Sequence, residues 1–191
     1  MTRQEFYVYA DSQEGYWEFY GGEPEPLPLT GTRHAQILQA VMLQMHDYFY
    51  REHGELGLHA NHSVQTDLYL ANDTSTEANL LCSVVPDILV CDPVCIQTGF
   101  VVGAPLMLLE VWSFSDSETY MARKRECYRK AGVRYFIEIA AKGLNIRMLD
   151  WETGEAWHRT LQSAGDSLCI PFFDGLAIQP YTDVFEQWLL G

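Results

Sequence analysis

The chain has 191 residues, of which 48% are hydrophobic, and it carries a formal net charge of −14 at pH 7. Its length and apolar content suffice for one ordinary domain with a substantial core, so we expect residues 1–191 to form a single domain. The acidic excess argues against a general nucleic-acid binder, because affinity for phosphate comes largely from Lys and Arg. The apolar runs are too short for a membrane span, and the first residues do not resemble a signal peptide.

Cysteine is present in an odd number, and its positions do not resemble the framework of a small secreted protein. Most of the cysteines lie in segments that we expect to be core. We therefore predict a soluble, reduced, cytoplasmic protein. The five positions are Cys82, Cys91, Cys95, Cys127 and Cys169.

The first half of the chain predicts strands around one long helix. Pro24, Pro26 and Pro28 favour a connector after the first strand, because proline cannot donate to a strand ladder. Further on, apolar and aromatic side chains recur at helical spacing and form one face. The expected elements are a strand over 16–23, a helix over 33–52 capped by Thr32, a strand over 62–70 and a polar loop over 72–79.

The second half contains two nearly continuous apolar runs, Val84–Cys91 and Pro105–Trp112, each interrupted by one acid, Asp87 or Glu110. Runs of this kind are typical of central strands that are covered on both faces. The other expected elements are a helix from about Ser115, strands over 134–140, 144–151 and 155–161 with turns at Lys142-Gly143 and Thr153-Gly154, and a helix over 181–190.

The helix after the second apolar run carries a lysine on its apolar side. Ser115 and Glu118 have the spacing of a capping box, which predicts the start of the helix. Projection at about 100° per residue places Lys124 at the centre of the apolar stripe. A lysine is seldom buried without a partner, so Glu110 is the expected partner. The alternative is a lysine near the rim whose amine reaches water.

Half of the basic residues of the chain lie on or just after this helix. Two interpretations stay open for them: a solvated helix face, or a track that follows phosphates. The six residues, of twelve in the chain, are Arg123, Lys124, Arg125, Arg129, Lys130 and Arg134.

Asp87, Glu110 and Lys124 together have the chemistry of a metal-dependent phosphodiesterase. Two acids can bind a hard divalent cation through oxygen. A lysine can neutralise charge that develops on a phosphate, or can orient a water beside it. The sequence therefore predicts that these three residues are catalytic.

Several short motifs occur in an order that resembles the Uma-type, restriction-endonuclease-like proteins of the PD-(D/E)xK nuclease fold. The resemblance covers about residues 15–188. The motifs are Val85-Pro86-Asp87, Glu110-Val111-x-Ser113, Lys124-x-x-x-Tyr128-x-x-x-Gly132-Val133, Glu18 with Gly22-Glu23, and Arg33-His34 at the start of the first long helix.

This resemblance implies an α/β fold with a central mixed β-sheet flanked by helices. It also implies that Asp87 and Glu110 bind Mg²⁺ or Mn²⁺ together with the main-chain carbonyl of Val111, and that Lys124 is the site lysine. Residues expected to support these from nearby are Glu18, His34 and Tyr128.

Two positions are informative, one where the chain differs from the wider nuclease fold and one where it differs from the Uma-type pattern. In the wider fold the lysine stands two residues after the acid, and this chain has Trp112 there. Uma-type proteins instead supply the lysine from the following helix, and this chain resembles them in that respect. Tyr120 stands where the family has an aspartate, four residues before Lys124. The absence of that aspartate is expected to weaken metal binding or the orientation of the lysine.

The resulting hypothesis is a divalent-metal-dependent endonuclease that hydrolyses nucleic acid, with DNA favoured over RNA, and that forms a homodimer or a higher homo-oligomer. Two alternatives stay open. One is a module without catalysis that keeps the nuclease fold and binds a protein partner. The other is an enzyme that hydrolyses a small phosphoester, which would suit the acidic charge.

Overall fold

The structure is a computed structural model, and it describes residues 1–52, 54, 57–60, 67–69, 82–97, 100–102, 104–113, 116–143, 145–163 and 165–181. The helices are α1 (Arg3–Asp11), α2 (Thr32–Glu52), α3 (Glu118–Lys130) and the short 3₁₀ helix η2 (Pro93–Cys95). The strands are β1 (Trp17–Tyr20), β2 (Glu23–Pro26), β3 (Gly57–Ala60), β4 (Asp67–Tyr69), β5 (Cys82–Val84), β6 (Ile88–Cys91), β7 (Ile96–Gln97), β8 (Phe100–Val102), β9 (Met107–Trp112), β10 (Tyr135–Ala140), β11 (Asn145–Asp150), β12 (Glu155–Thr160), β13 (Leu168–Cys169) and β14 (Ala177–Ile178).

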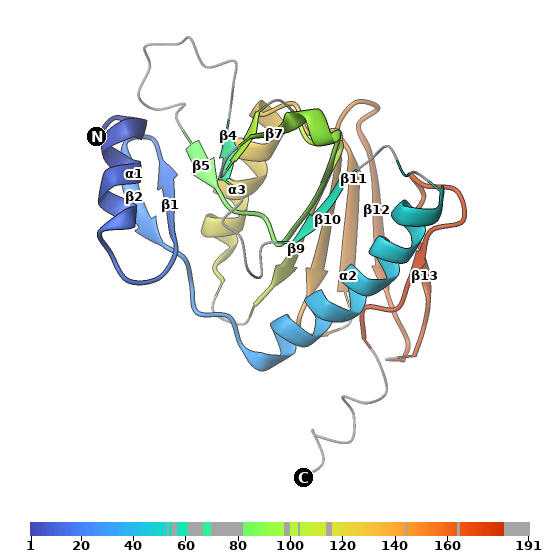
Figure 1. Ribbon diagram of the computed structural model, residues 1–191. Coiled ribbons are helices and arrows are strands. Elements are labelled where there is room, and N and C mark those ends of the chain that lie inside the picture. Colours follow the sequence, from blue (N-terminus) through green and yellow to red (C-terminus); the bar gives the residue numbers. More distant parts are fainter. Residues whose placement is uncertain are drawn as a thin grey trace.

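A mixed sheet in the order β12-β11-β10-β9-β6-β3 forms the centre of the molecule (Figure 1). Strands β9 and β10 are parallel, and the other neighbours in this sheet are antiparallel. A parallel pair needs a crossover, and α3 is the helix between these two strands. The predicted α/β fold with a central mixed sheet flanked by helices is therefore confirmed.

Helices α2 and α3 lie on either side of this sheet (Figure 1). Side chains of a strand alternate between the two faces, so Leu109 and Val111 join the core under α2 while Leu108 joins the core under α3. By the same alternation Glu110 belongs to the α3 face. This placement brings a charged residue of the central strand under the helix that carries the lysine.

A second sheet, in the order β2-β1-β5-β4-β8-β7, lies beside the first. The apolar run Val84–Cys91, predicted as one strand, divides into β5 of the second sheet and β6 of the central sheet. The segment Val85–Pro86–Asp87 crosses between them. Proline has no N–H to donate to a ladder, which is why the chain leaves one sheet here before joining the other. Asp87 thus stands at the junction of the two sheets.

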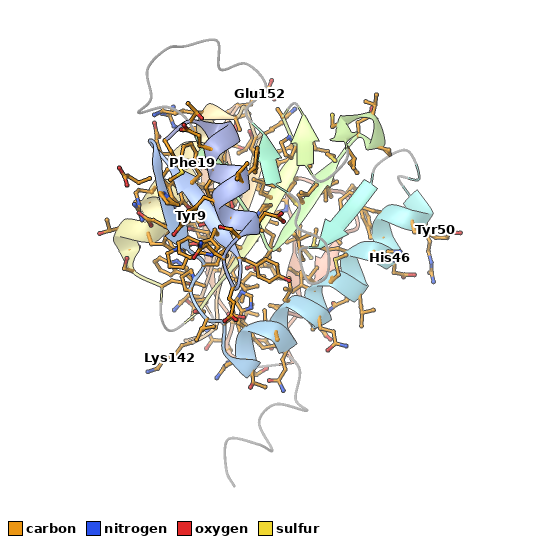
Figure 2. All side chains as sticks on the ribbon, turned by 60° about the vertical axis from the view of Figure 1, so that its left-hand side comes forward. Tyr9, Phe19, His46, Tyr50, Lys142 and Glu152 are labelled. Carbon is orange, nitrogen blue, oxygen red and sulfur yellow. The ribbon has the colours of Figure 1, made fainter. Side chains whose placement is uncertain are left out.

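The N-terminal segment contains two elements that the sequence analysis did not predict. Helix α1 begins with a capping box, in which the Thr2 side chain and Glu5 each accept from the other's backbone N–H. Its Phe6 stacks on Phe19 of β1, with ring centroids 4.9 Å apart. Figure 2 shows Phe19 next to α1. The predicted proline connector is wrong in part, because Glu23–Pro26 forms β2. Proline is tolerated there since β2 is an edge strand.

The remaining predictions fall close to the observed elements. Helix α2 and strands β10, β11 and β12 form as expected, and Gly143 and Gly154 have the positive φ angles that their turns need. Helix α3 is capped by Ser117, whose side chain accepts from Tyr120 N, rather than by Ser115. Ser115, the loop over 72–79, residues 62–66 and residues 182–190 lie outside the described residues.

One expectation about the cysteines needs correction. Cys127 is disulfide-bonded, whereas Cys91, Cys95 and Cys169 are free, so the prediction of a fully reduced chain is wrong for Cys127. Among the described helices, none combines the length and the hydrophobicity that would be needed to cross a membrane.

Candidate active site

The register of the central sheet brings the two candidate acids together. Strands β6 and β9 are antiparallel, with Ile88 opposite Leu109. Extending this register by one residue places Asp87 opposite Glu110, and directly opposite residues share a face. The backbone N–H of Val111 donates to Oδ2 of Asp87 over 2.7 Å, which holds the aspartate across the strand pair.

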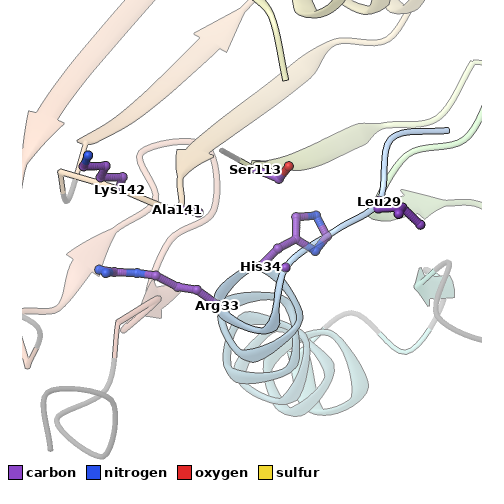
Figure 3. Close-up of a pocket in the computed structure, with 7 residues that line it drawn as sticks. Leu29, Arg33, His34, Ser113, Ala141 and Lys142 are labelled. Atoms are coloured by element: carbon purple, nitrogen blue, oxygen red, sulfur yellow. The ribbon is translucent and has the colours of Figure 1, made fainter. Parts of the chain in front are cut away.

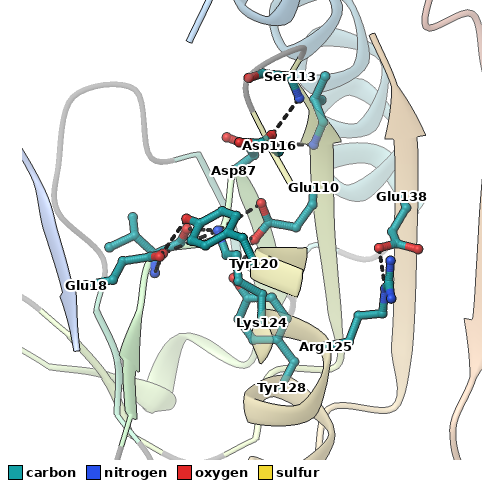
Figure 4. Close-up of polar contacts among 12 residues, drawn as sticks. Glu18, Asp87, Glu110, Ser113, Asp116, Tyr120, Lys124, Arg125, Tyr128 and Glu138 are labelled. Atoms are coloured by element: carbon teal, nitrogen blue, oxygen red, sulfur yellow. Dashed lines mark hydrogen bonds and ion pairs between the residues drawn. The ribbon is translucent and has the colours of Figure 1, made fainter. Parts of the chain in front are cut away.

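Lys124 is buried, with 2% of its surface exposed. Its Nζ lies 2.9 Å from Oε1 of Glu110 and 3.3 Å from Oε1 of Glu18 (Figure 4). It also donates to the carbonyl of Val85 over 3.0 Å. The predicted inward orientation of the lysine and its pairing with Glu110 are therefore what the structure shows, and Lys124 does not reach out to water.

Glu18 comes from β1, in the second sheet, and is 1% exposed. Its Oε1 accepts from the N–H of Val85 over 2.9 Å, while Oε2 accepts from the hydroxyls of Tyr20 and Tyr120 over 2.7 and 2.6 Å. Glu18 and Lys124 therefore hold opposite ends of the same residue, Val85, just before the Pro86-Asp87 turn. The two sheets are joined at this point by charged hydrogen bonds.

Tyr120, where the resemblance leads us to expect an aspartate, makes contacts that a carboxylate would not make. Its phenol donates to Glu18, and its ring lies 5.5 Å from Nζ of Lys124. The substitution therefore adds a donor to the buried carboxylate instead of a further negative charge. The sequence alone predicts only the absence of an acid at this position.

Glu110 is 4% exposed and accepts from Lys124 and from the Tyr128 hydroxyl. Burial raises the pKa of Glu110 to about 8, and the Asp87 carboxylate adds to this shift, although Lys124 and Tyr128 oppose it. Burial alone would lower the pKa of Lys124, but Glu110 and Glu18 outweigh burial and raise it well above the usual value. The ammonium is therefore charged at neutral pH.

His34 approaches Asp87 from the first turn of α2. Its Nε2 lies 3.0 Å from Oδ2 of Asp87, and the histidine is 5% exposed. Asp116, which the sequence analysis did not select, also lies close by and accepts from the N–H of Ser113 over 2.7 Å (Figure 4). Burial raises the pKa of Asp116. The structure thus brings together all the predicted site residues.

A pocket of about 400 Å³ opens beside His34, and it provides access from solvent to this end of β9 (Figure 3). Asp87 is the most accessible of the candidate acids, with 19% of its side chain exposed, compared with 5% for Glu110. The lining consists of Leu29, Gly31, Arg33, His34, Ser113, Ala141 and Lys142.

The carboxylate oxygens of the site are suitable ligands for a hard divalent cation, but those of Glu110 already contact other side chains. Asp87 and Glu110 offer carboxylate oxygens, the ligands that Mg²⁺ and Mn²⁺ prefer. Within the described ranges, no group of three or more Asp, Glu, His or Cys side chains is arranged to hold a metal ion. Both oxygens of Glu110 contact Lys124, and one also contacts Tyr128. A metal would therefore have to share Glu110 with these donors.

The basic residues of the α3 region are largely paired with acids. Arg123 pairs with Glu25, and Arg129 with Glu126, both on the exposed side of the helix. The interpretation as a solvated, ion-paired face is therefore the better one for this surface. The further pairs are Lys130 with Glu126, Arg134 with Asp150 and Glu152, and Arg125 with Glu118 and Glu138.

Comparison with known proteins gives a family and a fold. The model of the Uma2 family, described as "Putative restriction endonuclease", matches residues 3–180. No curated protein matches the chain. A crystal structure of a "putative nuclease belonging to DUF820" from Anabaena variabilis ATCC 29413 is similar over 90% of each chain, with a TM-score of 0.68 and 13% sequence identity. This level of identity supports a shared fold.

Proposed function

The chain belongs to the Uma2 family of restriction-endonuclease-like proteins, and we propose that it is a nuclease that hydrolyses phosphodiester bonds with Mg²⁺ or Mn²⁺, with DNA favoured over RNA. The observation that supports this most strongly is the placement of Asp87 opposite Glu110, with Lys124 within 2.9 Å of the glutamate. Lone charges in apolar strands are costly, so their convergence at one point favours chemistry.

Each residue has a distinct part in the proposal. Asp87, Glu110 and the carbonyl of Val111 would hold the cation, which when bound polarises the phosphate and lowers the pKa of a water. Lys124 carries a fixed positive charge that can neutralise charge developing on the phosphate. His34 fixes Asp87 from α2, and Tyr128 fixes Glu110 from α3.

The direct test is cleavage of a supercoiled plasmid at millimolar Mn²⁺ or Mg²⁺, with EDTA as the metal-free control. Asp87→Asn and Glu110→Gln keep the side-chain shape and should each lower the rate by at least about 100-fold. Lys124→Arg keeps the charge and should lower it less. Matched controls are Asp11→Asn, Glu155→Gln and Lys130→Arg, which lie on exposed or partly exposed positions away from the centre.

Cleavage that persists in Asp87→Asn and Glu110→Gln, with both variants folded by circular dichroism, would show that another centre is responsible. The contacts that occupy Glu110 favour one second candidate, a protein-interaction module without catalysis. Calorimetric titration with Mn²⁺ distinguishes it, because a module would bind no metal at millimolar concentration. Cleavage of bis(p-nitrophenyl) phosphate but not of plasmid would indicate a small phosphoester as substrate.

A further inference from the structure

A second pocket, of about 460 Å³, lies on the α3 side of the central sheet, beyond the site described above. This volume is within the range of small-molecule sites in proteins. It lies over the ends of β9, β10, β11 and β12, next to the first turns of α3. The lining residues that matter here are Trp112, Arg125, Glu138, Lys142, Arg147 and Arg159.

The lining is cationic although the chain as a whole is strongly acidic. Four of the lining residues are Lys or Arg and two are Glu, in a chain with a formal net charge of −14. A local excess of positive charge against such a background is the electrostatic pattern of a site for an anion.

Glu138 lines this pocket and forms ion pairs with two of its arginines. Its carboxylate is only 8% exposed and accepts from Nε of Arg125 over 2.7 Å, with Nη1 of Arg147 at 3.7 Å. Arg125 also bonds to Glu118 over 2.8 Å, so the excess of positive charge belongs to the lining as a whole, with four cationic side chains against two anionic ones. Arg125 comes from α3 and Arg147 from β11, so two different elements supply the guanidinium groups.

Two buried N–H groups in the lining lack hydrogen-bond partners. They are Nε1 of Trp112 and Nε of Arg147. An unsatisfied buried donor costs about 1–3 kcal/mol, so such groups call for an explanation. Both side chains can only donate. A ligand that reaches either group would have to offer an acceptor, and the surrounding charge favours an anionic one.

The pocket adjoins the proposed catalytic centre. Trp112 stands two residues after Glu110 on β9, and residues at this spacing share a face of the strand. Lys142 lines both this pocket and the one beside His34. The guanidinium carbon of Arg125 lies 5.7 Å from the centre of the Trp112 ring. An indole next to guanidinium groups suits a flat base that carries a phosphate.

We propose that this pocket, formed around Trp112, Arg125 and Arg147, binds one nucleotide, with its phosphate on the guanidinium groups and its base against the indole. The nucleotide can belong to a strand whose neighbouring phosphodiester lies at Glu110, or can be free. The inference rests on the proposed function for the choice of a nucleotide among anions, whereas the anion site rests on the pocket alone.

The test measures binding in EDTA, so that it does not depend on metal or on cleavage. A fluorescein-labelled 12-nucleotide single strand and free deoxyadenosine monophosphate are titrated by anisotropy and by Trp fluorescence. Arg147→Gln and Trp112→Leu should each weaken binding by at least about tenfold. The matched control, Arg129→Gln, removes a guanidinium from the exposed side of α3 and should change binding by less than about twofold.

The sources of the nucleotide are distinguished by competition between the two probes. Binding of the single strand alone assigns the pocket to a strand, binding of the monophosphate alone assigns it to a free nucleotide, and either result supports the site. Inorganic phosphate should bind more weakly than the monophosphate, because it lacks the base. The proposal is overturned if neither probe binds, or if Arg147→Gln and Trp112→Leu bind as tightly as the parent. If the parent protein binds a probe but does not cleave the plasmid, the result would instead count against the proposed function.

Discussion

Two consecutive residues of α3, Lys124 and Arg125, meet glutamates in two very different surroundings. Lys124 pairs with Glu110 of β9, and Arg125 pairs with Glu138 of β10. These two glutamates are direct partners in the parallel ladder. The lysine is almost completely buried, whereas the side chain of Arg125 is 16% exposed and lines a pocket.

The difference lies in the ratio of charges. Around Lys124, one ammonium is shared between Glu110 and Glu18, and Asp87 stands nearby. Around Glu138, the pocket is lined by four Lys or Arg side chains and two Glu side chains. A surplus of acid favours a cation and a surplus of base favours an anion, so neighbouring ion pairs on one helix can prepare both halves of a metal-dependent reaction on a phosphate.

The largest expected effect is on stability, and it separates the two pairs. Lys124→Met leaves Glu110 and Glu18 buried without a cation and should lower the free energy of unfolding by about 3–5 kcal/mol. Arg125→Met should cost about 1–2 kcal/mol, because Arg147 stays next to Glu138 and water reaches the site. Urea denaturation measures both. Equal losses would mean that the two surroundings do not differ as described.

A second difference concerns pH. Metal binding needs ionised Glu110, whose pKa is raised by burial to about 8. Below that pH the carboxyl group is increasingly protonated, so the affinity for Mn²⁺ should fall by about 50-fold between pH 8 and pH 6. Calorimetry at constant ionic strength measures this slope. Glu110→Gln should remove both the binding and its pH dependence, and a flat profile in the parent would contradict the assignment.

The smallest expected effect concerns the tyrosine that replaces the family's acid. Tyr120→Phe removes the hydroxyl that donates to Glu18 but keeps the ring beside Lys124. A hydrogen bond to a charged group suggests a loss of about 1–2 kcal/mol in unfolding free energy. Tyr9→Phe, on α1 and away from the centre, is the matched control. An unchanged stability would show that Tyr20 alone satisfies this oxygen of Glu18.

The candidate site could be anticipated from the sequence because its charges interrupt apolar patterns. Asp87 and Glu110 each stand alone in a strand-like run, and helical projection turns Lys124 inward. These are local signals, and they require no knowledge of which strands pair. The proximity of the three residues follows once the two runs are neighbours in one sheet.

Other features depend on pairing that the sequence does not specify. The partnership of Glu138 with Glu110 is set by the register of β9 and β10, on either side of a crossover helix. The change of sheet at Pro86 leaves no signal in the sequence, because Val84 and Val85 before it and Ile88–Cys91 after it are all apolar. Helix α1 is different, since Thr2 and Glu5 have the spacing of a capping box, a local signal that the sequence does contain.

The clamp on Val85 has a consequence for how the centre comes into being. Its N–H is held by Glu18, 67 positions earlier, and its carbonyl by Lys124, 39 positions later. Neither contact is local, and they come from a strand of the other sheet and from the crossover helix. The polar centre is therefore complete only when β1 and α3 have both packed against Val85. The geometry around Asp87 thus depends on contacts between segments that lie far apart in the sequence.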